Sequence, residues 1–151
     1  MSRIEEVELT NMCMICDGKG NVLVQNKTGH PAWHGWNFPG GHVEEGEYVT
    51  PSVIREMKEE TGLTVAHPKL CGIKQFPIDG GRYLVFFFKT HEFDGELRSS
   101  EEGKVEWVAR KDLPHIATVS DFMDMLKVFD QDELTEFQYV VEDDTWQVVL
   151  K

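Results

Sequence analysis

Short apolar stretches separated by turn residues recur along the chain and predict β-strands. ELTNMCMIC and NVLVQ flank the turn sequence DGKG, which predicts a hairpin of two strands near the N-terminus. KLCGIKQFPI and RYLVFFFKTHEF flank DGG and predict a second, longer hairpin, and KVEWVAR predicts another strand. FQYVV and WQVVL, on either side of EDDT, predict a hairpin at the end of the chain.

Two segments have the spacing of helices instead. We expect a helix over 50–61, with Thr50 as its N-cap, Pro51 at its first position and Gly62 at its C-terminal end. In VSDFMDMLKVF the apolar residues recur every three or four positions and predict an amphipathic helix whose apolar stripe belongs to the core. Strands interleaved with two helices, without regular βαβ alternation, predict an α/β (α+β) fold in which a mixed β-sheet is sandwiched between helices.

Length and charge narrow the class of protein. A chain of 151 residues is expected to form a single domain, residues 1–151. A formal net charge of -12 argues against binding to a nucleic acid backbone, so any nucleotide partner is expected to be a small molecule held through a metal ion. Without an 18-residue apolar run or the pattern of a secretion signal, the sequence predicts a cytoplasmic protein that does not enter a membrane.

The three cysteines fit a reducing compartment, because an odd number cannot all pair within one chain. The sequence CMIC raises the alternative of a zinc or redox site. In a strand, however, Cys13 and Cys16 would point to opposite faces, and no second pair of Cys or His residues completes four ligands. We therefore expect small apolar side chains in a sheet.

The sequence REMKEETG places several carboxylates on the first predicted helix. At about 100° per residue, Glu56, Glu59 and Glu60 share one face, and Lys58 lies across the helix from them. The helix alone fits either a solvated acidic surface or a functional site. The preceding loop, GGHVEEGE, adds three glycines and three more glutamates. Glycines that allow close approach, together with oxygen ligands, favour Mg2+ over zinc.

The spacing of these residues resembles a known family. Gly41, Glu47 and the run Arg55 to Leu63 fill every fixed position of the Nudix box, G-x5-E-x7-R-E-U-x-E-E-x-G-U, where U is a bulky aliphatic residue. The surrounding chain resembles the MutT/MutX-like branch, the 8-oxo-dGTP diphosphatases. The resemblance implies a Nudix fold and a hydrolase that cleaves a nucleoside triphosphate to the monophosphate and pyrophosphate.

The resemblance also implies a metal site for Mg2+ or Mn2+. Its ligands would be drawn from the box and from a late glutamate, namely Gly41, Glu56, Glu59, Glu60 and Glu102. Glu101, the neighbour of Glu102, is an alternative ligand because sequence alone does not fix the register.

Catalytic roles follow from the same resemblance. Glu56 is expected to act as general base, with Glu102 as its competitor, and Glu59 to assist through the metal. Arg55 would order the carboxylates by hydrogen bonding, and Glu47 would support that network.

Substrate contacts are implied at three positions. Lys27 is expected to contact phosphate, with a solvated lysine as the alternative. Asn37 is expected to read the purine edge. Asp121 is expected to contact the base, although an acid there also favours a helix N-terminus, where Ser120 is an alternative cap. Four aromatic residues are candidates either to stack on a purine or to lie in the core: Trp33, Trp36, Phe38 and Phe76.

Three alternatives stay open from the sequence. The substrate could be another nucleoside diphosphate derivative such as ADP-ribose, or an unmodified dNTP. A non-catalytic protein that senses nucleotides is the alternative of a different class, although an intact box argues against it. The sequence fits a monomer or a homodimer equally well.

Overall fold

The computed structural model describes residues 2–27 and 34–151, and it contains one large mixed sheet of six strands. Their order across the sheet is β11-β10-β6-β7-β1-β4. β1 runs parallel to β7, and β10 parallel to β6, whereas the other neighbours are antiparallel. The strand bounds are β1 (Glu6–Ile15), β4 (Gly40–His42), β6 (Lys69–Ile78), β7 (Gly81–Thr90), β10 (Glu136–Glu142) and β11 (Thr145–Leu150). The mixed sheet confirms the predicted fold class.

The remaining strands form two smaller sheets. One has the order β3-β2-β9, and the other pairs β5 with β8. Their bounds are β2 (Asn21–Lys27), β3 (Trp36–Asn37), β5 (Thr64–Ala66), β8 (Glu92–Asp94) and β9 (Gly103–Ala109). β9 contains the strand predicted from KVEWVAR, and β6 with β7 and β10 with β11 form the two later hairpins as predicted.

The first predicted hairpin is only partly correct. The chain does turn after β1, where Oδ1 of Asp17 accepts hydrogen bonds from the backbone N–H groups of Lys19 and Asn21 at 2.7 and 3.1 Å. Beyond one bridge between Cys16 and Val22, the strands then diverge into different sheets. The physical reason is that β1 already pairs on both edges, with β7 and β4, so no edge of β1 is left for β2.

The two predicted helices are present with shifted starts. α1 (Val49–Thr61) begins after Tyr48 and has no side-chain cap, so Thr50 lies inside the first turn and is not the N-cap. Pro51 is tolerated there because the first four N–H groups of a helix have no partner within it. Gly62 ends the helix at φ 81°, as predicted. α2 (Phe122–Asp130) starts after Asp121, so the cap position belongs to that residue and not to Ser120; a short 3-10 helix, η1 (Arg110–His115), precedes it.

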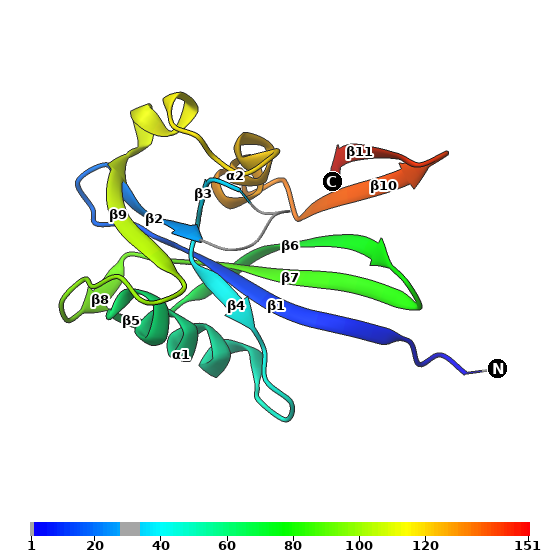
Figure 1. Cartoon of the computed structure of the whole chain (residues 1–151), viewed down its shortest axis with the longest axis horizontal. Helices are drawn as coiled ribbons and strands as arrows, with labels where there is room; N and C mark the ends of the chain where they lie inside the picture. Colours follow the sequence, from blue (N-terminus) through cyan, green and yellow to red (C-terminus); the bar gives the residue numbers. More distant parts are fainter. Residues whose placement is uncertain (1, 28–33) are drawn as a thin grey trace.

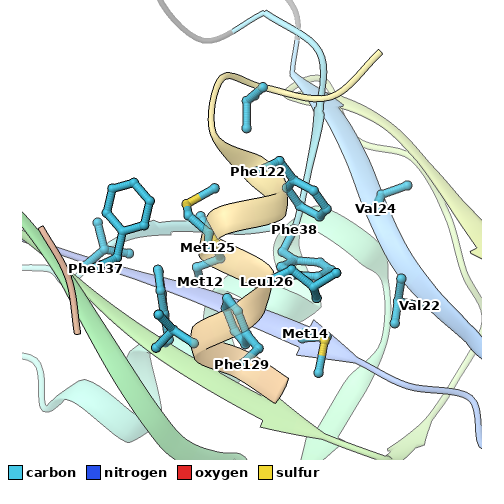
Figure 2. Packing of buried hydrophobic residues seen from close by; sticks show 14 of the residues in the cluster. Met12, Met14, Val22, Val24, Phe38, Phe122, Met125, Leu126, Phe129 and Phe137 are labelled. Atoms are coloured by element: carbon cyan, nitrogen blue, oxygen red, sulfur yellow. The ribbon is translucent and has the colours of Figure 1, made fainter. Parts of the chain in front are cut away.

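α1 and α2 cover opposite faces of the large sheet (Figure 1). The larger core lies under α2, where Phe122, Met125 and Phe129 pack on side chains from the sheet (Figure 2). The second core lies under α1 and includes Cys13, whereas Cys16 packs against the first core.

The two cysteines therefore point to opposite faces of the sheet, as expected. Burial raises the pKa of the Cys13 thiol, which suits an apolar packing role. Across residues 2–27 and 34–151, no helix is long and apolar enough to span a bilayer.

Candidate metal and catalytic site

The glycine strand β4 lies directly against helix α1. The backbone N–H of Gly40 donates a hydrogen bond of 3.0 Å to Oε2 of Glu60. A Cβ atom on Gly41 would lie 2.4 Å from Cδ of Glu56, well inside van der Waals contact. Glycine at position 41 lets the strand approach the helix, whereas a Cβ atom on Gly40 would meet the backbone of Asn11 on β1. The two contacts fix two carboxylates of the box, Glu56 and Glu60, beside the edge strand β4.

Three carboxylates meet at this junction. Glu56, Glu60 and Glu102 each place an oxygen within 4.8 Å of the others. Glu56 and Glu60 are 7% and 1% exposed, which is rare for glutamates, whereas Glu102 reaches in from the exposed turn before β9. We call these three residues the carboxylate cluster.

Among the residues that the structure describes, two other predicted metal ligands, Glu59 and Glu101, lie outside the carboxylate cluster. The side chain of Glu59 is 60% exposed, and it binds Arg55 at 3.0 Å instead of joining the cluster. Of the adjacent pair Glu101 and Glu102, only Glu102 contributes to the cluster. The turn before β9 therefore brings Glu102, and not its neighbour Glu101, close to the other two carboxylates.

Three carboxylates so close together repel one another, and a bound cation or a proton would relieve the repulsion. Burial, followed by the contact with Glu102, raises the pKa of Glu60 to about 9, against the opposing effect of Lys27. The same contact lowers the pKa of Glu102. Burial raises the pKa of Glu56 as well, although Arg55 opposes the shift.

The donor set fits a hard divalent cation. Oε1 of Glu60 is buried without a hydrogen-bond partner among the described residues, and Nζ of Lys27 lies 3.5 Å from it. A buried carboxylate oxygen in this state is costly unless a proton or a metal ion satisfies it. Three carboxylates that place oxygens close together match the preference of Mg2+ or Mn2+ for oxygen ligands.

Arg55 ties the box together through its guanidinium. Its Nε and Nη2 donate to the two oxygens of Glu47 at 2.7 and 2.9 Å, which lowers the pKa of that carboxyl to about 2. Nη1 donates to Glu56 at 3.1 Å and to Glu59 at 3.0 Å, and Nη2 also donates to the carbonyl of His42 at 3.0 Å. One planar group therefore holds the glycine strand, the loop acid and the helix acids in a single arrangement.

Sequence reasoning missed a buried polar pair behind the glycine strand. Asn11 on β1 donates through Nδ2 to Oγ of Ser52 on α1 at 2.9 Å, and its Oδ1 accepts from the N–H of Gly41 at 3.2 Å. Both side chains are almost fully buried. The available signal was an asparagine inside an apolar strand, since a buried amide must find partners.

A cavity of about 220 Å3 adjoins the cluster through Gly40 and Gly41. Lys27 lines it and donates to the carbonyl of Gly40 at 2.7 Å, and Asn37 lines it as well, with Oδ1 accepting from the N–H of Phe38 at 2.8 Å. Asp121 is absent from the described lining; its carboxylate accepts a hydrogen bond of 2.6 Å from Tyr139.

The aromatic candidates divide between cavity and core. Phe76 lines the cavity and stacks on Tyr83, with ring centroids 4.7 Å apart. Phe38 touches the cavity but is 1% exposed and packs between Phe122 and Phe129. Trp36 is half-buried against the α2 core, and Trp33 lies outside the described residues.

Two buried carboxylates and one exposed carboxylate, grouped beside a cavity with a lysine at its rim, form the class of site that binds a divalent cation together with phosphate groups. The sequence profile of the NUDIX domain matches residues 9–129. The chain therefore belongs to the Nudix hydrolase family, and it acts on phosphoric anhydride bonds.

Similar proteins agree on the family and differ in their substrates. An uncharacterized Nudix hydrolase of Bacillus subtilis, YvcI, is 36% identical over 114 residues, which cover 72% of this chain and 69% of that protein. An ADP-ribose pyrophosphatase of Methanocaldococcus jannaschii is 31% identical over 106 residues, covering 68% of this chain and 63% of that one. An 8-oxo-dGTP diphosphatase of Escherichia coli is 31% identical over 72 residues, covering 48% and 56%. The chain thus spans less than two thirds of the two relatives with a named substrate.

The crystal structure of a MutT protein from Bacillus halodurans has a TM-score of 0.76 and 31% identity, covering 95% of this chain and 97% of that one. The fold is therefore shared over nearly the whole length of both chains.

Proposed function

We propose that this protein is a Mg2+-dependent nucleoside triphosphate diphosphatase that prefers an oxidised purine nucleotide such as 8-oxo-dGTP, with Mn2+ as an alternative metal. The observation that carries the proposal is the carboxylate cluster at the mouth of a cavity whose described lining contains Lys27 and Asn37. The Escherichia coli relative named an 8-oxo-dGTP diphosphatase supports the choice of substrate. A role in the cytoplasmic nucleotide pool follows from that choice.

The carboxylate cluster would hold the cation, with the Gly41 carbonyl and Glu59 as the further ligands that the box implies. Glu59 would have to turn away from Arg55 to reach the cation. When bound, the cation neutralises the diphosphate and the charge that develops on it during phosphoryl transfer. Lys27 uses one of its three N–H donors in the hydrogen bond to the Gly40 carbonyl, so other donors can bind a phosphate oxygen.

The chemical step is hydrolysis of one P–O–P bond. The oxygen of a water molecule attacks one of the two phosphorus atoms of the α–β anhydride, that P–O bond breaks, and a nucleoside monophosphate and pyrophosphate are released. Glu56 accepts the proton of the attacking water, because Arg55 holds its carboxylate in place at 3.1 Å; Glu102 is the alternative base.

Base recognition is proposed for Asn37 and Asp121. Because Oδ1 of Asn37 is occupied by the N–H of Phe38, its amide nitrogen is left to donate to the ligand. Asp121 would reach the base from the α2 side, next to Tyr139.

A substrate panel with product identification tests the proposal. We expect release of pyrophosphate from 8-oxo-dGTP at a kcat/KM at least about 10-fold above that for dGTP, equivalent to about 1.4 kcal/mol. Equal turnover of the two nucleotides would refute the preference for oxidised purines.

Glu56→Gln tests the catalytic assignment. Loss of a general base and of one metal ligand should lower kcat by about 100-fold or more. Glu101→Gln is the matched control, because it removes a neighbouring carboxylate outside the cluster. Full activity in Glu56→Gln would show that the reaction centre lies elsewhere.

The relative named an ADP-ribose pyrophosphatase favours a second candidate, hydrolysis of ADP-ribose to AMP and ribose 5-phosphate. The same cluster serves either reaction, because both break a P–O–P bond. Including ADP-ribose in the panel separates them, since only a triphosphate releases pyrophosphate.

A further inference from the structure

Lys74 is a buried lysine in the wall of the cavity beside the carboxylate cluster. It lies on β6 and is 4% exposed. Its Nζ is 5.1 Å from the ring centroids of Phe137 and Tyr139, 5.9 Å from that of Phe76, and 3.6 Å from Sδ of Met125. The faces of aromatic rings attract an ammonium group, so these neighbours hold the cation in a defined place.

The register of the sheet shows which way Lys74 faces. Lys74 pairs with Val85 on β7, Val85 with Thr10 on β1, and Thr10 with His42 on β4. Directly paired residues point to the same face of a sheet, and all four line the cavity. The cavity therefore extends across four strands, with Lys74 at the β6 end and His42 at the β4 end.

This geometry sets the orientation of a nucleotide. The carboxylate cluster joins the cavity at β4, so the phosphates belong at that end. Neighbouring strands are about 4.8 Å apart, so β6 lies roughly 14 Å from β4. A ligand whose phosphates lie at β4 therefore extends its nucleobase toward Lys74.

A lysine at this place has a cost that an apolar residue would avoid. Burial lowers the pKa of Lys74 to about 8, while the carboxylate of Asp121 opposes the shift. A methionine or leucine would fill the same space without desolvating a charge.

Building on the proposed function, we propose that Lys74 is a specificity-determining residue that donates a hydrogen bond to the 6-carbonyl oxygen of a purine. An ammonium group has three donors and no acceptor. Guanine and hypoxanthine present an acceptor at position 6, whereas adenine presents an amino group that is itself a donor. The cavity therefore selects 6-oxopurines and rejects 6-aminopurines, because two buried donors that face each other cannot form a hydrogen bond.

Equilibrium binding of monophosphates tests this without any cleavage. For the wild-type protein in the presence of Mg2+, calorimetry should show dGMP and dIMP binding about 10- to 100-fold more tightly than dAMP, the range of one hydrogen bond to a charged group. dIMP shares the 6-carbonyl and the N1–H of dGMP and lacks the 2-amino group, so its comparison with dAMP tests this edge of the purine on the unmodified protein. Equal affinities for dIMP and dAMP would overturn the proposal.

Lys74→Met removes the donor while keeping a long side chain suited to the aromatic surroundings. It should bring the ratio of dIMP to dAMP affinity close to one. Lys69→Met, at an exposed position of the same strand, is the matched control and should leave the ratio unchanged. A ratio retained in Lys74→Met would also overturn the proposal.

The two proposals fail separately. If the wild-type protein releases no pyrophosphate from any triphosphate, the proposed function is refuted, and the monophosphate titrations still decide the role of Lys74. If triphosphates are hydrolysed but dIMP and dAMP bind equally, only the role of Lys74 is lost.

Discussion

Gly41→Ala should separate catalysis from folding. The added Cβ would lie 2.4 Å from Cδ of Glu56 and 2.5 Å from both carboxylate oxygens. Nonbonded carbon atoms prefer about 3.5–4.0 Å, so the carboxylate must move by about 1 Å or more. A displacement of that size at a reacting group costs about 100-fold in rate. The moving atoms end a side chain, and Gly41 is not among the described glycines with positive φ, so stability should change by less than about 1 kcal/mol.

The assay pairs pyrophosphate release with urea unfolding monitored by circular dichroism. Gly40→Ala provides the contrast, because its Cβ would lie 2.1 Å from the backbone oxygen of Asn11, which cannot swing away. That variant should lose about 1–3 kcal/mol of unfolding free energy. If Gly41→Ala kept the wild-type kcat/KM, the absence of a Cβ at this position would not be needed to place the Glu56 carboxylate.

Three further outcomes follow from the site and the cavity. Lys74→Met should stabilise the protein at pH 7 by up to about 3 kcal/mol, because the lysine pKa is about 8 in the fold against an ordinary value of 10.5, and each unit is about 1.4 kcal/mol. The stabilisation by Lys74→Met should shrink as pH rises from 8 to 10.5, because the lysine of the unfolded wild-type protein then loses its charge as well. Urea unfolding at several pH values measures this stabilisation, and a constant value would contradict the explanation. Arg55→Lys keeps one charge but loses the planar fork, so kcat should fall about 10- to 100-fold with a smaller change in KM, and unchanged steady-state kinetics would show that charge alone suffices. Glu60→Gln should raise the Mg2+ concentration for half-maximal activity by about 10-fold or more, and an unaltered Mg2+ titration would remove Glu60 from the metal site.

Local signals in the sequence were sufficient for the elements that build the site. Gly62 ends α1 where a left-handed residue was expected, and the paired apolar stretches around DGG form β6 and β7. These features depend on neighbours in the chain, and turn and cap preferences report such neighbours directly. The spacing of the box in turn places Glu56 and Glu60 on one face of α1, where the structure has them.

The burial of individual side chains could not be predicted from local sequence signals. The helical wheel treats Glu59 and Glu60 alike, yet one is mostly exposed and the other is 1% exposed. The difference arises because β4 packs along one side of α1, and that approach depends on its pairing with β1. Lys74 likewise looks ordinary within an alternating strand, although rings from β10 as well as from its own strand lie around it among the described residues. Contacts between distant segments decide both cases.

The placement of the two lysines bears on how an acidic protein accepts a polyanion. The net charge of -12 opposes a triphosphate at long range. The described lining of the cavity, however, contains Lys27 and Lys74 and no acidic side chain. Charges in water are screened beyond about 8–10 Å at physiological salt, so a bound nucleotide responds mainly to these lysines and to the cation at the carboxylate cluster. Salt then has opposing effects, because it weakens the repulsion from the surface and the attraction within the cavity, and the buried attraction is screened less.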